Sequence, residues 1–107
     1  FIQVRRKVIK DKFMPFKIIF LNARGNNLGY YVHLRTTFTV LPWQYYQAKF
    51  KVSKNWKTFK LNLTDFKRSG VLLPNKINSN HIKSIALVAF GKEHEVELDV
   101  SNIGFIN

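Results

Sequence analysis

The sequence contains no cysteine, which excludes disulfide bonds, cysteine nucleophiles and thiolate metal sites within these 107 residues. No apolar run approaches the ~20 residues that a membrane-spanning helix needs. The chain also shows no sustained helical periodicity, internal repeat or low-complexity tract. It begins with Phe1-Ile2-Gln3-Val4 and has neither an initiator methionine nor a leader, which predicts that it starts inside a domain.

Motifs for catalysis are missing as well. We find no glycine-rich phosphate loop, no nucleophile elbow and no Ser–His–Asp arrangement, and the three histidines lack metal-ligand spacing. Alternate acidic residues near the end of the chain would lie about 6–7 Å apart on one strand face, so we interpret them as an exposed acidic stripe rather than a metal site. These acids are Glu93, Glu95, Glu97 and Asp99. We therefore expect a non-enzymatic domain with no metal ion and no cofactor.

Acidic residues are few: 6 Asp and Glu face 18 Lys and Arg, for a net charge of +12. Such an excess is compatible with nucleic acid, an anionic membrane or an acidic protein partner. Lys, Asn and Ile are abundant together, however, so we favour compositional bias and solubility as its main cause. Among aromatic residues that could stack on single-stranded nucleic acid, only Tyr31 and Tyr45 fit, which makes nucleic acid the least favoured partner.

Hydrophobic residues make up 46% of the chain, enough for a core, and they alternate as in strands. We expect a short helical turn at Thr64–Phe66, a polar loop over residues 67–81 and a hairpin at Gly91–His94. This pattern predicts an all-β fold, a jelly-roll-like β-sandwich formed by a single domain over residues 1–107. The seven predicted strands cover residues 1–9, 16–22, 30–36, 45–52, 56–63, 82–90 and 95–106.

Two of these strands separate their side chains into distinct faces. In the first strand, Tyr30, Val32 and Leu34 alternate with polar residues. In the second strand, Tyr46, Ala48 and Phe50 alternate with polar residues in the same way. The opposite face combines aromatic, amide and cationic groups that can bind hydroxyls, phosphate or a peptide edge. It could also be a solvated face whose tyrosines pair across strands. The predicted face comprises Tyr31, His33, Arg35, Tyr45, Gln47 and Lys49, with Trp43 at its rim.

Several segments, in order, resemble one known family. Gly29-Tyr30-Tyr31-Val32-His33-Leu34-Arg35-Thr36 comes first, followed by Pro42-Trp43-x-x-Tyr46-x-Ala48-x-Phe50. Leu63-Thr64-Asp65-Phe66, Ile82-Lys83-Ser84-Ile85-Ala86-Leu87 and a closing Val96-Glu97-Leu98-Asp99-Val100 strand complete the pattern. This sequence resembles the CIA30 domain of complex I intermediate-associated protein 30. The resemblance covers essentially the whole chain, except that the family's amino-terminal part, with its Asp-Gly-x-Met-Gly-Gly motif, is absent.

The resemblance implies a galactose-binding-like jelly roll, similar to carbohydrate-binding modules, from which one or more amino-terminal strands are missing. It also implies a chaperone-like factor that binds assembly intermediates of respiratory complex I, an NADH:ubiquinone oxidoreductase. Such a factor would be cytoplasmic in a bacterium and in the mitochondrial matrix of a eukaryote, with peripheral attachment to a membrane left open. The alternatives are a carbohydrate-binding module that uses the same face to hold a glycan, and a basic domain that binds single-stranded nucleic acid.

Overall fold

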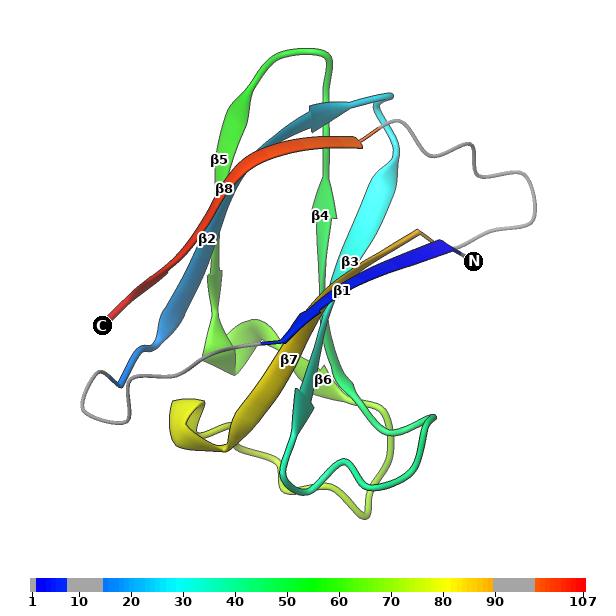
Figure 1. The fold of residues 1–107 in the computed structure, drawn as a ribbon, viewed down its shortest axis with the longest axis vertical. Coiled ribbons are helices and arrows are strands. Elements are labelled where there is room, and N and C mark those ends of the chain that lie inside the picture. The colour runs from blue at the N-terminus through cyan, green and yellow to red at the C-terminus, as the bar shows by residue number, and fades with distance from the viewer. Residues whose placement is uncertain (1, 8–14, 90–97) are drawn as a thin grey trace.

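The computed structural model describes residues 2–7, 15–89 and 98–107, which form β-strands joined by loops and two short 3₁₀ helices (Figure 1). The helices are η1 (Leu63–Asp65) and η2 (Ser79–His81). The described strands are β1 (Ile2–Lys7), β2 (Ile18–Gly25), β3 (Gly29–Thr36), β4 (Tyr46–Lys51), β5 (Lys57–Asn62), β6 (Lys67–Arg68), β7 (Ile82–Ala89) and β8 (Leu98–Ile106).

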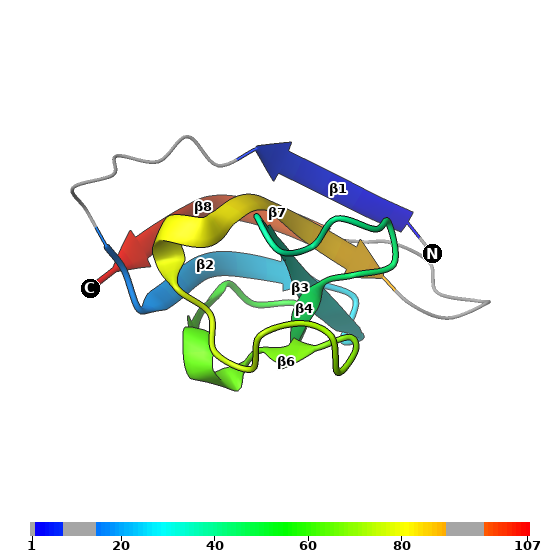
Figure 2. The ribbon, with the colours of Figure 1, turned by 90° about the horizontal axis from the view of Figure 1, so that it is seen from below.

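The strands form two antiparallel sheets that face each other (Figure 2). The larger sheet has the order β1-β7-β3-β4-β6, and the smaller one has the order β5-β2-β8. In the larger sheet β3 is the middle strand, while in the smaller sheet β2 lies between β5 and β8. This arrangement confirms the predicted all-β, jelly-roll-like sandwich.

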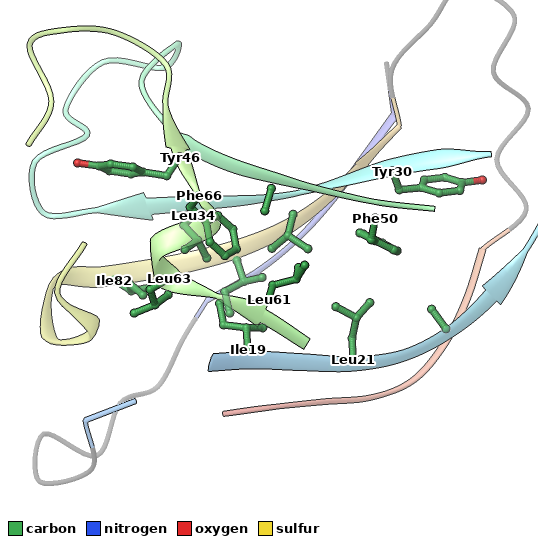
Figure 3. Close-up of a cluster of buried hydrophobic side chains, with 14 of the residues drawn as sticks. Ile19, Leu21, Tyr30, Leu34, Tyr46, Phe50, Leu61, Leu63, Phe66 and Ile82 are labelled. Atoms are coloured by element: carbon green, nitrogen blue, oxygen red, sulfur yellow. The ribbon is translucent and has the colours of Figure 1, made fainter. Parts of the chain in front are cut away.

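The core lies between the two sheets and is filled by alternate residues of their inner strands (Figure 3). Ile19 and Leu21 of β2 face Leu34 of β3 and Phe50 of β4 across the interior. These side chains are almost completely buried, and the burial of such apolar area is the main favourable term in folding. The apolar residues that recur at every second position of these strands are therefore the residues that face the core.

The turn between β2 and β3 uses a residue in the left-handed region. Asn27 has a φ of 62°, which asparagine tolerates better than most residues. This conformation agrees with the turn signal in the Gly25-Asn26-Asn27 segment. The turn leads the chain from the smaller sheet into the middle of the larger one.

Two connections differ from the sequence prediction. The segment 67–81, predicted as a polar loop, contains the two-residue strand β6 and the helix η2. Strand β7 lies in the larger sheet and β8 in the smaller one, so the predicted hairpin between them is wrong, although Gly91–His94 itself lies outside the described residues. Local patterns missed both features because β6 is too short to show periodicity, and sheet membership depends on long-range pairing.

Candidate functional site

The two strands of the predicted face lie side by side in the larger sheet. Strand β3 pairs with β4 so that Tyr31 is opposite Lys49 and His33 is opposite Gln47. Their neighbours Val32 and Leu34 are buried in the core, which directs the intervening side chains to the outer surface of the sheet. The register thus brings together residues that are 14 or more positions apart in the sequence.

His33 is the centre of a packed cluster. Its imidazole stacks on the ring of Tyr45, with centroids 4.2 Å apart and planes 9° from parallel. Its Nε2 lies 3.1 Å from the Oε1 of Gln47, and it donates a hydrogen bond to this oxygen in the tautomer that carries the proton on Nε2. The side chain is only 7% exposed, so neighbouring groups hold it rather than water. We therefore assign His33 a positioning role, in which it fixes the Tyr45 ring and the Gln47 amide.

Tyr31 and Lys49 extend this cluster along the strands. The Nζ of Lys49 lies 6.0 Å from the centroid of the Tyr31 ring, at the outer limit for a cation–π contact. The rings of Tyr31 and His33 meet edge to face at 6.4 Å. Lys67 of β6 pairs with Gln47 and adds a second exposed cation beside the cluster. Sequence reasoning missed Lys67 because β6 was not predicted.

Arg35 lies on the same strand but turns its guanidinium to the β3–β4 loop. It donates hydrogen bonds to the carbonyl oxygens of Thr39 at 2.7 Å, Pro42 at 3.0 Å and Leu41 at 3.2 Å. A register shift between Arg35 and Thr36 marks the end of regular pairing with β7. The structure thus gives Arg35 a clear task, which is to hold this loop in shape.

Trp43, predicted at the rim, lies on the β3–β4 loop with 67% of its surface exposed. Its carbonyl oxygen accepts a hydrogen bond from the Ser69 hydroxyl at 3.2 Å, which ties the loop to the segment after β6. The main-chain N–H of Tyr45 also donates to that hydroxyl, at 3.0 Å. Trp43 is therefore close in sequence to the predicted face, but it lies on a loop at one end of the sandwich.

The outer face is not equally open on both sides of β3. On the β7 side, Ala86 pairs with His33 and Val88 pairs with Tyr31, and both are buried. On the β4 side, Lys49 is exposed and Gln47 is partly exposed. A partner would therefore reach the cluster from β4 and β6, where cations and aromatic rings lie together.

Ionisable groups elsewhere in the described residues do not form a second centre. No group of three His, Cys, Asp or Glu residues there could hold a metal ion. Of the predicted acidic stripe, Asp99 forms an exposed ion pair with Arg24 at 3.1 Å, while residues 93–97 lie outside the described ranges. Burial raises the pKa of Tyr46, which faces the core, and the nearby charge of Arg68 partly opposes this. None of the described helices is long and apolar enough to cross a membrane.

Comparison with known proteins gives one family and one fold. Residues 1–100 match the model of the family described as complex I intermediate-associated protein 30 (CIA30). A search of curated proteins found no match. Among solved structures, the chain resembles a family 11 carbohydrate-binding module from Clostridium thermocellum in complex with a beta-1,3-1,4-mixed-linked tetrasaccharide. The TM-score is 0.71 at 14% identity, over 97% of this chain but only 66% of the module, so the likeness concerns the fold.

Proposed function

The chain belongs to the complex I intermediate-associated protein 30 (CIA30) family, and on that premise we propose that it is a non-catalytic binding domain that acts in the assembly of respiratory complex I. It would capture a protein intermediate through the outer face of β3 and β4 and release it as assembly proceeds. The partner is a protein subunit of the complex, in the compartment where that subunit is assembled. No cofactor enters this role.

The cluster of His33, Tyr45 and Gln47 carries the proposal. Its ring stack and hydrogen bond fix an aromatic surface and an amide before a partner arrives, which lowers the entropic cost of binding. Tyrosine supplies a large contact area with few rotatable bonds and is common in binding hot spots. Lys49 and Lys67 flank the cluster and would favour an acidic surface on the partner.

The experiment compares two variants in which an exposed lysine is replaced by glutamate, one in each sheet. Lys49→Glu changes the proposed face, whereas Lys60→Glu changes an exposed lysine of β5 in the other sheet. Tagged wild-type and variant chains are used to recover complex I subunits from cells that assemble the complex, and the subunits are quantified by mass spectrometry. We expect Lys49→Glu to reduce their recovery and Lys60→Glu to leave it unchanged. Wild-type recovery of no complex I subunit would refute the role in assembly.

A second candidate function is glycan binding on the same face. It is favoured by the fold shared with a carbohydrate-binding module and by the partly exposed Tyr45 in the stack with His33, since flat rings pack against sugars. Binding of a beta-1,3-1,4-mixed-linked glucan tetrasaccharide can be measured by calorimetry. The glycan hypothesis requires binding that is abolished by Tyr45→Ala and is insensitive to salt.

The salt dependence of binding distinguishes a nucleic-acid ligand from both a protein partner and a glycan. Binding of a single-stranded oligonucleotide to basic residues releases counterions, so its affinity must fall steeply between about 50 and 200 mM salt. A protein partner held by the aromatic cluster should lose much less affinity over this range. Measurement of both complexes at the two salt concentrations therefore distinguishes a basic nucleic-acid surface from the proposed contact face.

A further inference from the structure

The loop end of the sandwich exposes a group of apolar side chains that the proposed function does not use. They lie on two loops, the β3–β4 loop (residues 37–45) and the loop between β6 and η2 (residues 69–78). Val40 is 77% exposed, and Val71 and Leu72 are 82% and 86% exposed. We call this group the loop-tip cluster, and its members are Phe38, Val40, Leu41, Trp43, Val71 and Leu72.

The two loops are neighbours at one end of the molecule, as Figure 1 and the end-on view of Figure 2 show. A hydrogen bond joins them directly: the N–H of Ser69 donates to the carbonyl oxygen of Tyr45 at 2.8 Å. The first loop is also bonded to η2, which follows the second loop, because the N–H of Thr37 donates to the carbonyl oxygen of His81 at 2.8 Å. The apolar tips therefore project from a common base.

Polar side chains within the loops and in the adjoining strands β3 and β6 bond several backbone groups of both loops. Arg35 binds three carbonyl oxygens of the first loop, and Gln44 accepts from the N–H groups of Val40 and Leu41, both at 2.9 Å. In the second loop, Arg68 donates to the carbonyl oxygen of Leu73 at 2.9 Å. A backbone whose polar groups are bonded internally can enter an apolar phase at lower cost than a free loop.

The charge around the tips has one sign. Neither the 37–45 loop nor the 66–81 segment contains an acidic residue, whereas Lys67, Arg68 and Lys76 are exposed there. Apolar tips combined with cations match the two layers of an anionic lipid surface, which are acyl chains below and phosphate groups above. Tryptophan suits the boundary between these layers, because its ring is apolar and its N–H is polar.

We propose that the loop-tip cluster docks this domain on an anionic lipid bilayer. Val71, Leu72, Val40 and the Trp43 ring enter the interface, while Lys76 contacts lipid phosphates and the nearby charges of Lys67 and Arg68 attract them. A bilayer fits the protruding tips better than a protein partner does, because lipid adapts to separate projections whereas a protein would need matching pockets. This inference rests on the loop end alone and does not depend on a role in complex I assembly.

Vesicle sedimentation tests the docking surface. The 107-residue chain is mixed with vesicles of phosphatidylcholine alone or of phosphatidylcholine with phosphatidylglycerol in equal parts. We expect binding to the mixed vesicles, at least tenfold weaker binding for the double variant Val71→Ser/Leu72→Ser, and weak binding to neutral vesicles. Leu28→Ser, which changes an exposed apolar residue of the β2–β3 turn, serves as the control and should bind like the wild type.

Fluorescence locates the surface directly. The Trp56→Phe variant retains Trp43, whereas Trp43→Phe retains Trp56, which lies in the β4–β5 connection at the other end of the sandwich (Figure 1). Mixed vesicles containing brominated lipid should shift the Trp43 emission to the blue and quench it, with little effect on Trp56.

Three results would overturn the proposal. The first is no binding to mixed vesicles, and the second is equal binding by the Val71→Ser/Leu72→Ser variant, which would indicate adsorption by net charge. The third is a dimer in lipid-free sedimentation equilibrium that this variant abolishes, which would mean that the tips bind a second copy.

Discussion

The imidazole of His33 in β3 lies parallel to the ring of Tyr45, with centroids 4.2 Å apart, and Tyr45 directly precedes β4, the neighbouring strand of the larger sheet. The stack sets the orientation of an aromatic ring that is partly accessible to a partner. Two variants of Tyr45 separate the roles of its ring and its hydroxyl. Tyr45→Phe should retain the stack, so partner recovery should stay near wild type, whereas Tyr45→Ala should reduce it.

The stack between His33 and Tyr45 should also contribute a measurable interaction free energy to the stability of the fold. In a double-mutant cycle with His33→Ala and Tyr45→Ala, we expect a coupling of about 0.5–1.5 kcal/mol in the free energy of unfolding, typical of aromatic pairs. Urea denaturation of the four chains provides the measurement. Additive effects of the two substitutions would mean that the stack contributes nothing to stability.

Lysine should not replace Arg35, because the three contacts use two separate nitrogens of a planar guanidinium, whereas lysine offers a single nitrogen. We expect Arg35→Lys to lower the free energy of unfolding by about 1–3 kcal/mol and to speed amide exchange at Val40 and Leu41. Arg24→Lys is the control, since its exposed ion pair with Asp99 should contribute less than about 1 kcal/mol. Equal losses in the two variants would contradict the special role of Arg35.

Gly104 of β8 should not accept a side chain, because a Cβ there would lie 2.3 Å from the Cζ of Phe20. The Phe20 ring must move, and we expect Gly104→Ala to destabilise the fold by about 1–3 kcal/mol. At Gly29 the nearest atom is the Cε of the flexible Lys49 side chain, so Gly29→Ala should cost less. If the Phe20 ring is the cause, Gly104→Ala should cost less in a Phe20→Ala background than in the wild type, as denaturation would reveal.

Tyr46 should make the free energy of unfolding depend on pH in the alkaline range. Burial raises the pKa of its phenol above the ordinary value of about 10, so the folded state favours the neutral, protonated form. This contribution is fully present below pH ~10 and is lost as the pH rises through the raised folded-state pKa.

Tyr46→Phe provides the comparison, because phenylalanine does not titrate and cannot donate to the carbonyl oxygen of Pro74. Wild type should be more stable at pH 7, and its advantage should shrink above pH ~10. Urea denaturation of both chains from pH 7 to 11 measures this difference. A constant difference would show that the Tyr46 phenol does not titrate differently in the folded state.

Much of the local structure could be predicted from alternation. Val32 and Leu34 alternate with Tyr31 and His33, and this period of two residues is enough to divide β3 into a core face and an outer face. The prediction that Tyr31, His33, Tyr45, Gln47 and Lys49 share a surface therefore required only strand parity. The short turn at η1 was also predicted from its sequence.

The sheet to which each strand belongs could not be predicted in this way. β4 and β5 are separated by a short turn yet lie in different sheets, as do β7 and β8. Pairing depends on the free energy of the whole core, because residues distant in sequence must pack together. The same limit hid β6, whose two residues are recognised only through their pairing with Tyr46 and Gln47.

The sequence by itself determined the all-β class, the faces of the inner strands, the excess of positive charge and the family to which the chain belongs. Tertiary structure decided what each side chain touches. It placed Arg35 on the loop carbonyls, buried His33 between Tyr45 and Gln47, and gathered apolar loop tips at one end. The reason is physical: side-chain periodicity is a local property of the backbone, whereas contacts and exposure arise from pairing between distant segments.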